Sequence, residues 1–314
     1  MVWLRIDADP QIEHVERLTE EAFGSRPVSA KKLGEGAYGI VYDVQLPHTP
    51  DRVVVKWQKR IGQGMREARQ LKELRKHALV RVPEVLYYHP GSADVPFEAI
   101  VMEHIPGTPA SELPAPPAEI APRFASDAID VLMHWHGVRQ GKGYGPLDGP
   151  FRTNWADYYR QRIYAYWSEI QSICPRENHL PAEMLQLAGR SLDAAEAILG
   201  PRDNEAVLLH SDYWLANILI DSKTYRITGV IDPLDAEWGD RELDLILLNV
   251  YWGRELDLLG EYCRRVPSDE QFELRQVFYR FWYEIQSYAR IRWHEDGLNR
   301  SLTQRLDMLM SRYL

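Results

Sequence analysis

The order of apolar and polar residues predicts one helix and then a series of short strands in the first third of the chain. Between residues 10 and 23, apolar residues recur every three or four positions and Gly24 follows them, which predicts an amphipathic helix. Next come short runs rich in β-branched and aromatic residues, with Gly or Pro between them. They predict strands at 28–33, 40–46, 52–57, 84–88 and 97–105, interrupted by one helix at about 64–77. We therefore expect a small sheet that carries one main helix.

A proline-rich stretch follows this sheet. Its prolines are incompatible with a regular helix or a central strand; they are Pro106, Pro109, Pro114, Pro116, Pro117 and Pro122. We place a domain boundary at about residues 105–117. The chain then divides into an N-lobe of residues 1–105 and a C-lobe of residues 106–314.

The pattern beyond the prolines is mostly helical. Apolar and aromatic residues recur at helical spacing after Asn154, a favourable N-cap. Two more helices are predicted at about 182–199, ending at Gly200, and at about 269–293, where Ser268 and Gln271 have capping-box spacing. Strand-like pieces interrupt the helices at 206–209, 218–221 and 226–231. The whole pattern predicts an α+β protein with a sheet-rich N-lobe and a larger, mostly helical C-lobe.

The composition and charge of the chain exclude several classes of protein. Hydrophobic residues make up 45% and charged residues 26% of the 314 residues, which excludes a disordered polar chain and suggests about two domains. No apolar run approaches bilayer length, and the first ten residues lack the apolar core of a signal peptide. The net charge of −9 argues against nucleic-acid binding, and Cys174 and Cys263 lack a metal-ligand spacing. We expect a cytoplasmic protein without nucleic-acid or membrane partners.

A glycine-rich turn joins the first two predicted strands. Gly34, Gly36 and Gly39 form the pattern G-x-G-x-x-G. In a dinucleotide-binding unit a helix should open after the last glycine, whereas here a strand follows. A glycine-rich turn between two strands is typical of the loop that covers nucleotide phosphates in kinases. A hairpin turn without a ligand is an open alternative.

A lysine and a glutamate complete this candidate phosphate site. Lys56 ends an apolar strand, where its ammonium could lie beside phosphates, although exposed lysines at strand ends are common. Glu67, eleven residues later on the predicted helix, could hold the Lys56 side chain extended. Glu73 is a competitor on the same helix, and we favour Glu67 because it lies in the first turns.

Three polar residues in the C-terminal half lie at the ends of apolar strands. Asp212 and Asn217 share one loop, and Asp232 follows the next strand. Phosphoryl transfer needs a carboxylate that accepts the proton of the attacking hydroxyl, and amide and carboxylate oxygens that bind Mg²⁺. Asp212 and Asn217 could also merely cap turns, and for either residue alone that is the better interpretation.

Taken in order, these residues resemble the eukaryotic-like kinase fold. The similarity is greatest to the aminoglycoside phosphotransferase and choline kinase superfamily of small-molecule kinases, and it covers nearly the whole chain. It rests on Gly34, Gly36, Gly39, Lys56, Glu67, residues 102–105, Asp212, Asn217 and Asp232. Three further segments look like the fructosamine kinase branch: residues 212–214, 231–233 and 242–245.

The resemblance implies a two-lobed fold, ATP and Mg²⁺ as cofactors, and a role for each matching residue. Asp212 is the catalytic aspartate, and Asn217 and Asp232 are Mg²⁺ ligands. Lys56, braced by Glu67, contacts the α- and β-phosphates. Adenine docks on the strand at 97–105, and Asp244 steadies the catalytic loop. The adenine contacts are the Met102 side chain, the Glu103 carbonyl and the Ile105 N–H.

We accordingly expect a kinase that transfers the γ-phosphate of ATP to a hydroxyl of a small molecule. The acceptor could be a sugar derivative, an amino-sugar, a ketosamine or an aminoglycoside-like compound. Only eleven residues separate Asp232 from Asp244, too few for the peptide-docking segment of a protein Ser/Thr kinase. That kinase class and a non-catalytic nucleotide-binding module are the alternatives. The sequence leaves open the acceptor, ATP against GTP, and the oligomeric state.

Other polar residues near these motifs allow two interpretations. An acidic cluster follows Asp232 and could bind an amine of the substrate or form a solvated loop; its members are Asp235, Glu237, Asp240 and Glu242. His210 could lie near the metal, but imidazole suits Mg²⁺ poorly, so we expect a packed, hydrogen-bonded residue. Trp135 is expected in a helical core.

Overall fold

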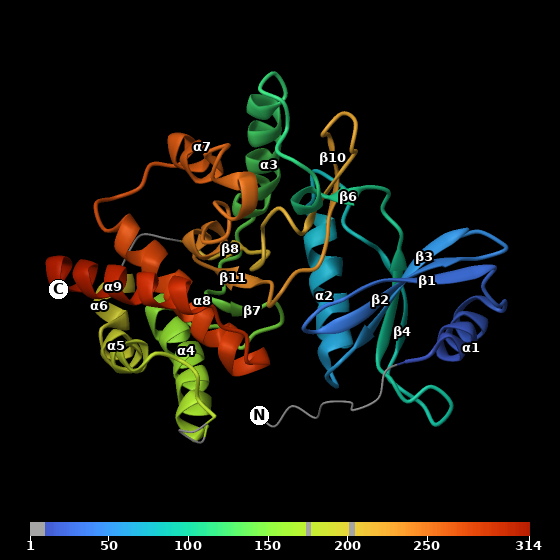
Figure 1. The fold of residues 1–314 in the computed structure, drawn as a ribbon, viewed down its shortest axis with the longest axis horizontal. Coiled ribbons are helices and arrows are strands. Elements are labelled where there is room, and N and C mark those ends of the chain that lie inside the picture. Colours follow the sequence, from blue (N-terminus) through green and yellow to red (C-terminus); the bar gives the residue numbers. More distant parts are fainter. Residues whose placement is uncertain (1–9, 174–176, 201–204) are drawn as a thin grey trace. The chain divides into compact units, whose positions relative to one another are not determined.

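A five-stranded antiparallel sheet dominates the N-terminal part of the fold (Figure 1). The computed structural model describes residues 10–173, 177–200 and 205–314. The strand order is β1-β2-β3-β5-β4, and every neighbouring pair is antiparallel. The strands are β1 (Ser29–Glu35), β2 (Gly39–Gln45), β3 (Arg52–Gln58), β4 (Val85–His89) and β5 (Ala99–Glu103). All five predicted strands are thus present, with ends shifted by a few residues.

The two faces of this sheet carry different chemistry. Side chains alternate along β3, and Val53, Val55 and Trp57 are buried in an apolar core with residues of helix α1 (Ile12–Phe23). Helix α2 (Gln63–Lys76) contacts β3, β4 and β5. The even-numbered residues of β3 face it, because Lys56 and Gln58 both reach Glu67. The predicted main helix therefore lies where it can meet the lysine.

The sheet and its two helices belong to one of two structural units. This first unit comprises the described residues up to His134 together with Trp214–Asp235. The second segment contributes β9 (Ile218–Ile220) and β10 (Ile227–Val230), which form a small sheet with β6 (Thr108–Pro109). In the proline-rich stretch, β6 and the single turn η1 (Ala110–Glu112) precede helix α3 (Ala121–His136).

The second unit, Trp135–Tyr213 with Ala236–Leu314, is mostly helical. Its long helices α4 and α8 pack against each other, as do α8 and α9. A small sheet, in the order β7-β11-β8, lies beside the loop that carries Asp212. The elements are β7 (Gly145–Pro146), α4 (Trp155–Ser172), α5 (Ala182–Asp193), α6 (Ala195–Leu199), β8 (Val207–Leu208), β11 (Glu237–Gly239), η2 (Arg241–Leu245), η3 (Tyr251–Gly253), α7 (Leu258–Arg265), α8 (Phe272–Ile291) and α9 (Asp296–Tyr313). Together the two units confirm the predicted α+β class.

Two helix predictions in this unit were wrong in detail. The helix expected at 182–199 is two helices, which meet at Ala194, the C-cap of the first and the N-cap of the second. The helix expected from residue 269 begins at Phe272 and has no capping box. Instead the Asp269 carboxylate accepts the Gln271 N–H at 2.9 Å. By contrast, Asn154 caps α4 as predicted, accepting a hydrogen bond from the Asp157 N–H.

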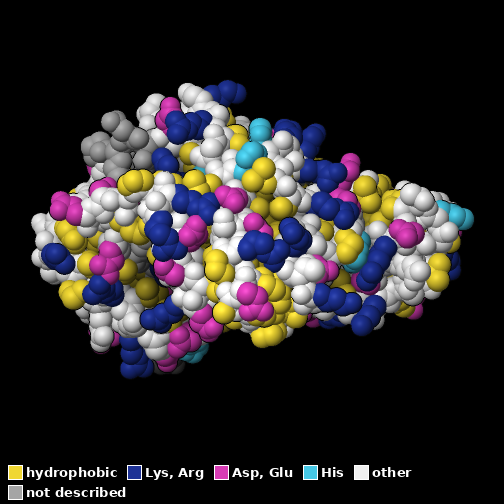
Figure 2. Space-filling view, turned by 90° about the horizontal axis from the view of Figure 1, so that it is seen from above, with side chains coloured by type: hydrophobic (Ala, Val, Ile, Leu, Met, Phe, Trp, Pro, Cys, Tyr) yellow, Lys and Arg dark blue, Asp and Glu magenta, His cyan; other side chains and the backbone are white. Residues whose placement is uncertain are grey.

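No helix among the described residues is both long and apolar enough to cross a membrane. On the face shown in Figure 2, basic and acidic side chains are interspersed. Cys263 is a half-buried free thiol, and Cys174 lies outside the described residues.

Candidate functional site

Lys56 lies at the centre of a charged cluster in the first unit. Its Nζ donates to Glu67 Oε1 at 2.7 Å and to Asp232 Oδ1 at 2.5 Å. The side chains of Lys56 and Glu67 are 7% and 6% exposed, whereas that of Asp232 is 54% exposed. The lysine is thus held between a buried carboxylate and one that faces solvent. Glu73, the alternative partner, bonds Lys76 at the surface.

The electrostatics keep Lys56 charged. Burial alone would lower the pKa of Lys56, but Asp232 and Glu67 more than offset that effect and hold the pKa above its usual value. A buried ammonium whose position is fixed by two carboxylates is preorganised to meet a third anion.

The glycine-rich turn is the hairpin between β1 and β2. It is closed by the Gly36 N–H, which donates to the Gly39 carbonyl at 2.9 Å. Lys59 Nζ ties the turn to β3 by bonding the Gly36 carbonyl at 2.9 Å and Glu35 at 2.6 Å. A Cβ at Gly39 would lie 2.6 Å from the Trp57 carbonyl, whereas Gly34 and Gly36 have open space around them. The strand after the last glycine is present as predicted.

Asn217 and Asp232 are held together in the same unit. Asn217 Nδ2 donates to the Asp232 carbonyl at 3.3 Å, and the Ile231 N–H donates to the Asn217 carbonyl at 2.9 Å. Asp232 has a left-handed backbone (φ 57°), which is uncommon outside glycine and is often found at functional positions.

The donor set at Asn217 and Asp232 fits Mg²⁺. Amide and carboxylate oxygens are ligands that this ion prefers, and it commonly takes few protein ligands beside phosphate and water. Among the described residues, no group of three or more His, Cys, Asp or Glu side chains could hold a metal ion. A metal at Asp232 would therefore depend on one carboxylate, one amide and further oxygens from the nucleotide or solvent.

Asp212 lies in the second unit and is approached by helix α8. The Tyr283 hydroxyl donates to Asp212 Oδ1 at 3.3 Å. The preceding residue, Ser211, has a left-handed backbone (φ 64°). Its N–H donates to Asp244 Oδ1 at 2.6 Å, and the His210 N–H donates to Asp244 Oδ2 at 2.8 Å. One carboxylate thus fixes the strained backbone directly before Asp212.

Asp244 is itself supported by a buried chain of hydrogen bonds. Its Oδ2 lies 3.2 Å from His136 Nε2, and His136 Nδ1 lies 2.8 Å from the Tyr262 hydroxyl. Asp244 does not cap the 3₁₀ helix η2, because Asp240 is its N-cap and accepts the Glu242 N–H. His210 is buried and its ring stacks on Trp135 with centroids 5.6 Å apart, as expected for packed residues.

The residues expected to bind adenine lie in and just after β5. Met102 and Ile105 are buried. The Glu103 side chain bonds Arg75 Nη1 at 2.9 Å and Arg81 Nη2 at 2.5 Å. Its carboxylate is therefore occupied by arginines, and its backbone N–H donates to the Glu84 carbonyl at 2.8 Å.

The acidic cluster after Asp232 is not a solvated loop. Each carboxylate bonds a specific partner, and the three after Asp235 are buried. The pairs are Asp235 with Arg66 at 2.7 Å, Glu237 with the Tyr158 hydroxyl at 2.6 Å and with Arg162, Asp240 with the Tyr279 hydroxyl at 2.8 Å, and Glu242 with Arg275 at 2.7 Å. Through these bonds the acidic cluster stabilises the segment that follows Asp232.

The structure brings together Lys56, Glu67, Asn217 and Asp232 within one unit. It also reveals one polar residue that the sequence analysis missed, Tyr283. The only sequence signal for it is the spacing of Tyr279, Tyr283 and Gln286 at i, i+4 and i+7, which places them on one face of α8. That face bonds Asp240, Asp212 and Arg162 in turn.

A two-lobed α+β fold with a glycine hairpin, a lysine–glutamate pair and strand-end aspartates defines a kinase-like phosphotransferase. The model of the phosphotransferase enzyme family (APH) matches residues 29–293, and the chain belongs to this family. The fold is also that of solved structures. A protein from Haemophilus somnus 129PT, provisionally assigned as a fructosamine-3-kinase, aligns with a TM-score of 0.68 at 17% identity, covering 94% of this chain and 96% of that one.

A second solved structure and two curated relatives extend the comparison. A thermostable mutant of aminoglycoside phosphotransferase APH(4)-Ia, bound to ADP and hygromycin B, aligns with a TM-score of 0.68 at 19% identity over 95% of this chain and 98% of that one. YcbJ of Escherichia coli K12, an uncharacterized protein, is 24% identical over 63% of each chain, so the match spans less than two thirds of that relative. A probable ketoamine kinase of Lactiplantibacillus plantarum is 27% identical over 50% of this chain and 56% of its own.

Proposed function

We propose that this protein is an ATP- and Mg²⁺-dependent kinase that phosphorylates a hydroxyl of a small molecule. The observation that carries the proposal is the Lys56 cluster, in which one buried ammonium is fixed by Glu67 at 2.7 Å and Asp232 at 2.5 Å. Family membership supports the same reaction class. The N-lobe of residues 1–105 would hold the nucleotide, and the C-lobe of residues 106–314 would supply the catalytic loop and the acceptor site.

In this proposal the nucleotide contacts Lys56, the glycine hairpin and the residues in and just after β5. Lys56 neutralises charge on the α- and β-phosphates while Glu67 holds it extended. Gly34, Gly36 and Gly39 let the hairpin backbone approach the phosphates. Adenine contacts Met102, the Glu103 carbonyl and the Ile105 N–H.

The metal would be held by Asn217 and Asp232. Mg²⁺, when bound there, would supply positive charge that offsets the negative charge developing during phosphate transfer. Asn217 donates through Nδ2 to the Asp232 backbone, so its amide is already oriented before any ligand arrives. Asp232 would exchange its bond with Lys56 for the metal, since its carboxylate is half exposed.

Asp212 would orient the acceptor hydroxyl and accept its proton. The Asp244 contacts fix the backbone before it, and Tyr283 restrains its carboxylate. Catalysis then comes from alignment and charge neutralisation, with little covalent work for the protein.

For the acceptor we propose a ketosamine, an amino-sugar or an aminoglycoside-like compound. The ketoamine kinase relative and the hygromycin-bound structure support this class. Within the second unit, Tyr158, Arg162 and Glu237 form a hydrogen-bonded group beside the Asp212 loop, because the Leu209 N–H bonds the Glu237 carbonyl at 2.9 Å. Tyr158 and Arg162, which are only partly buried and are oriented by the buried Glu237, offer donors that suit a polyhydroxylated substrate.

The test is ADP release over a panel of ketosamines, amino-sugars, aminoglycosides, choline and simple sugars, with the wild type and Asp212→Ala. We expect turnover with one acceptor class and its loss by about 10³-fold in Asp212→Ala, while Mg·ATP still binds. Asp221→Ala is the matched control, because Asp221 is an exposed turn residue that lies nine positions after Asp212 in the sequence. Equal turnover in Asp212→Ala would refute the catalytic role.

A calorimetric titration separates the metal role from the catalytic one. Asp232→Ala should weaken Mg·ATP binding while leaving the weak binding of metal-free ATP nearly unchanged. An unaltered Mg²⁺ dependence would contradict the assignment. Phosphate incorporation into proteins with no small-molecule acceptor would favour a protein kinase, and ATP binding without any transfer would favour a non-catalytic module.

A further inference from the structure

The second unit contains a cavity that is separate from the residues assigned above to phosphate transfer. Its volume is about 430 Å³, within the range of small-molecule sites, and its lining comes from η2, α7, the turn after α7 and the start of α8. Leu245, Val266 and Phe272 provide apolar walls. Neither the glycine hairpin nor Asp212 contributes to it.

The acidic side chains that line this cavity have a cationic partner, whereas its arginine has no hydrogen-bond or ion-pair partner among the described residues. Glu242 and Asp269 both bond the buried guanidinium of Arg275, at 2.7 and 2.9 Å. Arg241 also lines the cavity, and no hydrogen bond or ion pair of its side chain is found within the described part of the chain. A half-buried guanidinium normally has an anionic or carbonyl partner.

The remaining negative charge does not provide that partner. Asp269 shares Arg275 with Glu242, so this trio keeps one excess negative charge. The Asp269 side chain is 54% exposed, and water therefore screens it. Arg241 is left as the cationic group of the cavity that a ligand could satisfy.

We propose that this cavity binds a small organic anion. A carboxylate or phosphate group would pair with Arg241, whose guanidinium forms two parallel hydrogen bonds with either anion. The apolar body of the same ligand would pack on Leu245, Val266 and Phe272. We define this cavity, lined by Arg241 and these apolar residues, as the Arg241 pocket.

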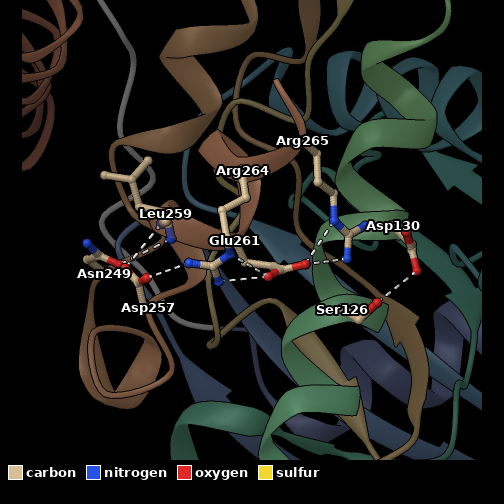
Figure 3. A network of polar contacts seen from close by, with 9 residues as sticks. Ser126, Asp130, Asn249, Asp257, Leu259, Glu261, Arg264 and Arg265 are labelled. Atoms are coloured by element: carbon tan, nitrogen blue, oxygen red, sulfur yellow. Dashed lines mark hydrogen bonds and ion pairs between the residues drawn. The ribbon is translucent and has the colours of Figure 1, made fainter. Parts of the chain in front are cut away.

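Helix α7 forms one wall of the pocket and is held in place by hydrogen bonds of its own. Asp257 caps α7 by accepting the Gly260 N–H at 3.2 Å, and Arg264 bonds both Asp257 at 3.0 Å and Glu261 at 2.7 Å (Figure 3). These contacts fix Tyr262 and Cys263, which face the pocket.

Tyr262 connects the pocket to the Asp212 loop. Its hydroxyl bonds His136, His136 bonds Asp244, and Asp244 accepts the N–H groups of His210 and Ser211. A ligand that moves Tyr262 is therefore coupled to the backbone directly before Asp212. Any consequence for phosphate transfer rests on the proposed function, whereas binding does not.

Alkylation of Cys263 by iodoacetamide tests binding without any need for activity. In a Cys174→Ser background Cys263 is the single cysteine, and burial raises the pKa of its thiol, so the reaction can be timed by mass spectrometry. Phenylacetate and phenyl phosphate are the probes, and uncharged phenylacetamide is the control. We expect saturable slowing, by about fivefold or more, with the two anions only; the tighter of the two identifies the carboxylate or the phosphate source.

Arginine variants decide whether the pocket charge is responsible. Arg241→Gln should abolish the protection, and Arg241→Lys should retain part of it. Arg254→Gln removes an exposed arginine outside the pocket. In this variant the two anions should slow the alkylation of Cys263 as much as they do in the parent. Protection that survives Arg241→Gln, equal protection by phenylacetamide, or none with either anion at 20 mM would overturn the proposal.

A second measurement tests the connection to the loop. In ¹⁵N spectra, phenylacetate or phenyl phosphate should shift the amide signals of His210 and Ser211, and Tyr262→Phe should reduce those shifts while Cys263 stays protected. Protection without any shift would overturn the coupling. Loss of kinase activity in the acceptor panel would leave both readouts unchanged, so the two proposals fail separately.

Discussion

The Tyr283 hydroxyl donates a hydrogen bond of 3.3 Å to Oδ1 of Asp212, linking the middle of α8 to the loop expected to carry catalysis. A tyrosine on a helix is a more rigid support than a loop residue, because its ring is fixed by packing. The same helix face also bonds Asp240 through Tyr279 at 2.8 Å. The carboxylate of Asp212 is therefore positioned from two sides, by its own backbone through Asp244 and by α8.

Replacing Tyr283 by Phe removes this hydrogen bond and leaves the ring in place. A hydrogen bond to a charged group contributes about 1.5–3 kcal/mol, and the long distance places this one at the low end. We expect kcat to fall about tenfold with little change in the KM for ATP. Tyr279→Phe is the control: it should lower the melting temperature through Asp240 but leave kcat within about twofold. Equal effects of both variants on kcat would contradict a positioning role for Tyr283.

Glu67→Gln tests how Lys56 is held. The amide keeps the shape of the side chain but removes the charge that fixes the ammonium at 2.7 Å. We expect kcat/KM for ATP to fall by about 10- to 100-fold, because Lys56 would no longer be held extended toward the phosphates. Glu73→Gln, on the surface of the same helix, should change kcat/KM by less than twofold. Steady-state kinetics with varied Mg·ATP gives both values.

The three glycines of the hairpin should differ in their tolerance of alanine. A Cβ at Gly39 would lie 2.6 Å from the Trp57 carbonyl, so Gly39→Ala must displace strand β2 or β3. We expect it to destabilise the protein by about 1–3 kcal/mol in urea unfolding. Gly36→Ala meets nothing within 4 Å and should unfold like the wild type, while the KM for ATP rises. Equal unfolding of the two variants would show that Gly39 is not sterically required.

Much of the fold was predictable because it depends on local patterns. The run of β-branched residues before Lys56 predicted a strand at 52–57, which the structure shows as β3 (Arg52–Gln58). The position of Glu67 in the first turns of the predicted helix favoured it over Glu73 as the partner of Lys56, and the structure joins Glu67 to Lys56. Asn154 also acts as the predicted cap. The strand and the cap involve neighbours in sequence or one turn of a helix, whereas the contact between Lys56 and Glu67 joins a strand to a helix eleven residues later.

Long-range contacts were not predictable in the same way. Tyr283 lies 71 residues from Asp212, and no local pattern links them. The acidic cluster was ambiguous because the sequence does not show that Arg275 or Tyr279 reaches it. The helix start at Phe272 was misplaced because Asp269 bonds Arg275 as well as the Gln271 N–H. That error is not a long-range effect, because Arg275 lies only six residues from Asp269.

Asp244→Asn should lower both the stability of the protein and its catalytic rate. Asp244 accepts two backbone N–H groups and contacts His136, and its side chain is completely buried. The amide cannot accept at both positions, so one buried N–H loses its partner at a cost of about 1–3 kcal/mol. We expect a lower urea midpoint and a kcat reduced by 10-fold or more. Asp257→Asn, at the exposed cap of α7, should lower stability slightly and leave kcat unchanged.

Glu284 provides a pH-dependent stability test away from the candidate site. Burial raises the pKa of the Glu284 carboxyl, and Arg280, 2.7 Å away, opposes the shift without cancelling it. The folded state therefore binds this proton more tightly than the unfolded state. The stability it contributes is complete below the unfolded pKa of 4.5 and is lost as the pH rises through the folded value.

We expect the free energy of unfolding to decline from pH 4.5 upward by at most about 1.4 kcal/mol per pH unit from this group. Glu284→Gln should remove that part of the slope, so the variant gains stability relative to the wild type as the pH increases. Glu273→Gln, an exposed position on the same helix, should follow the wild-type profile. Urea titrations between pH 4.5 and 8 measure the difference, and parallel profiles for wild type and Glu284→Gln would show that the carboxyl is not destabilised by its burial.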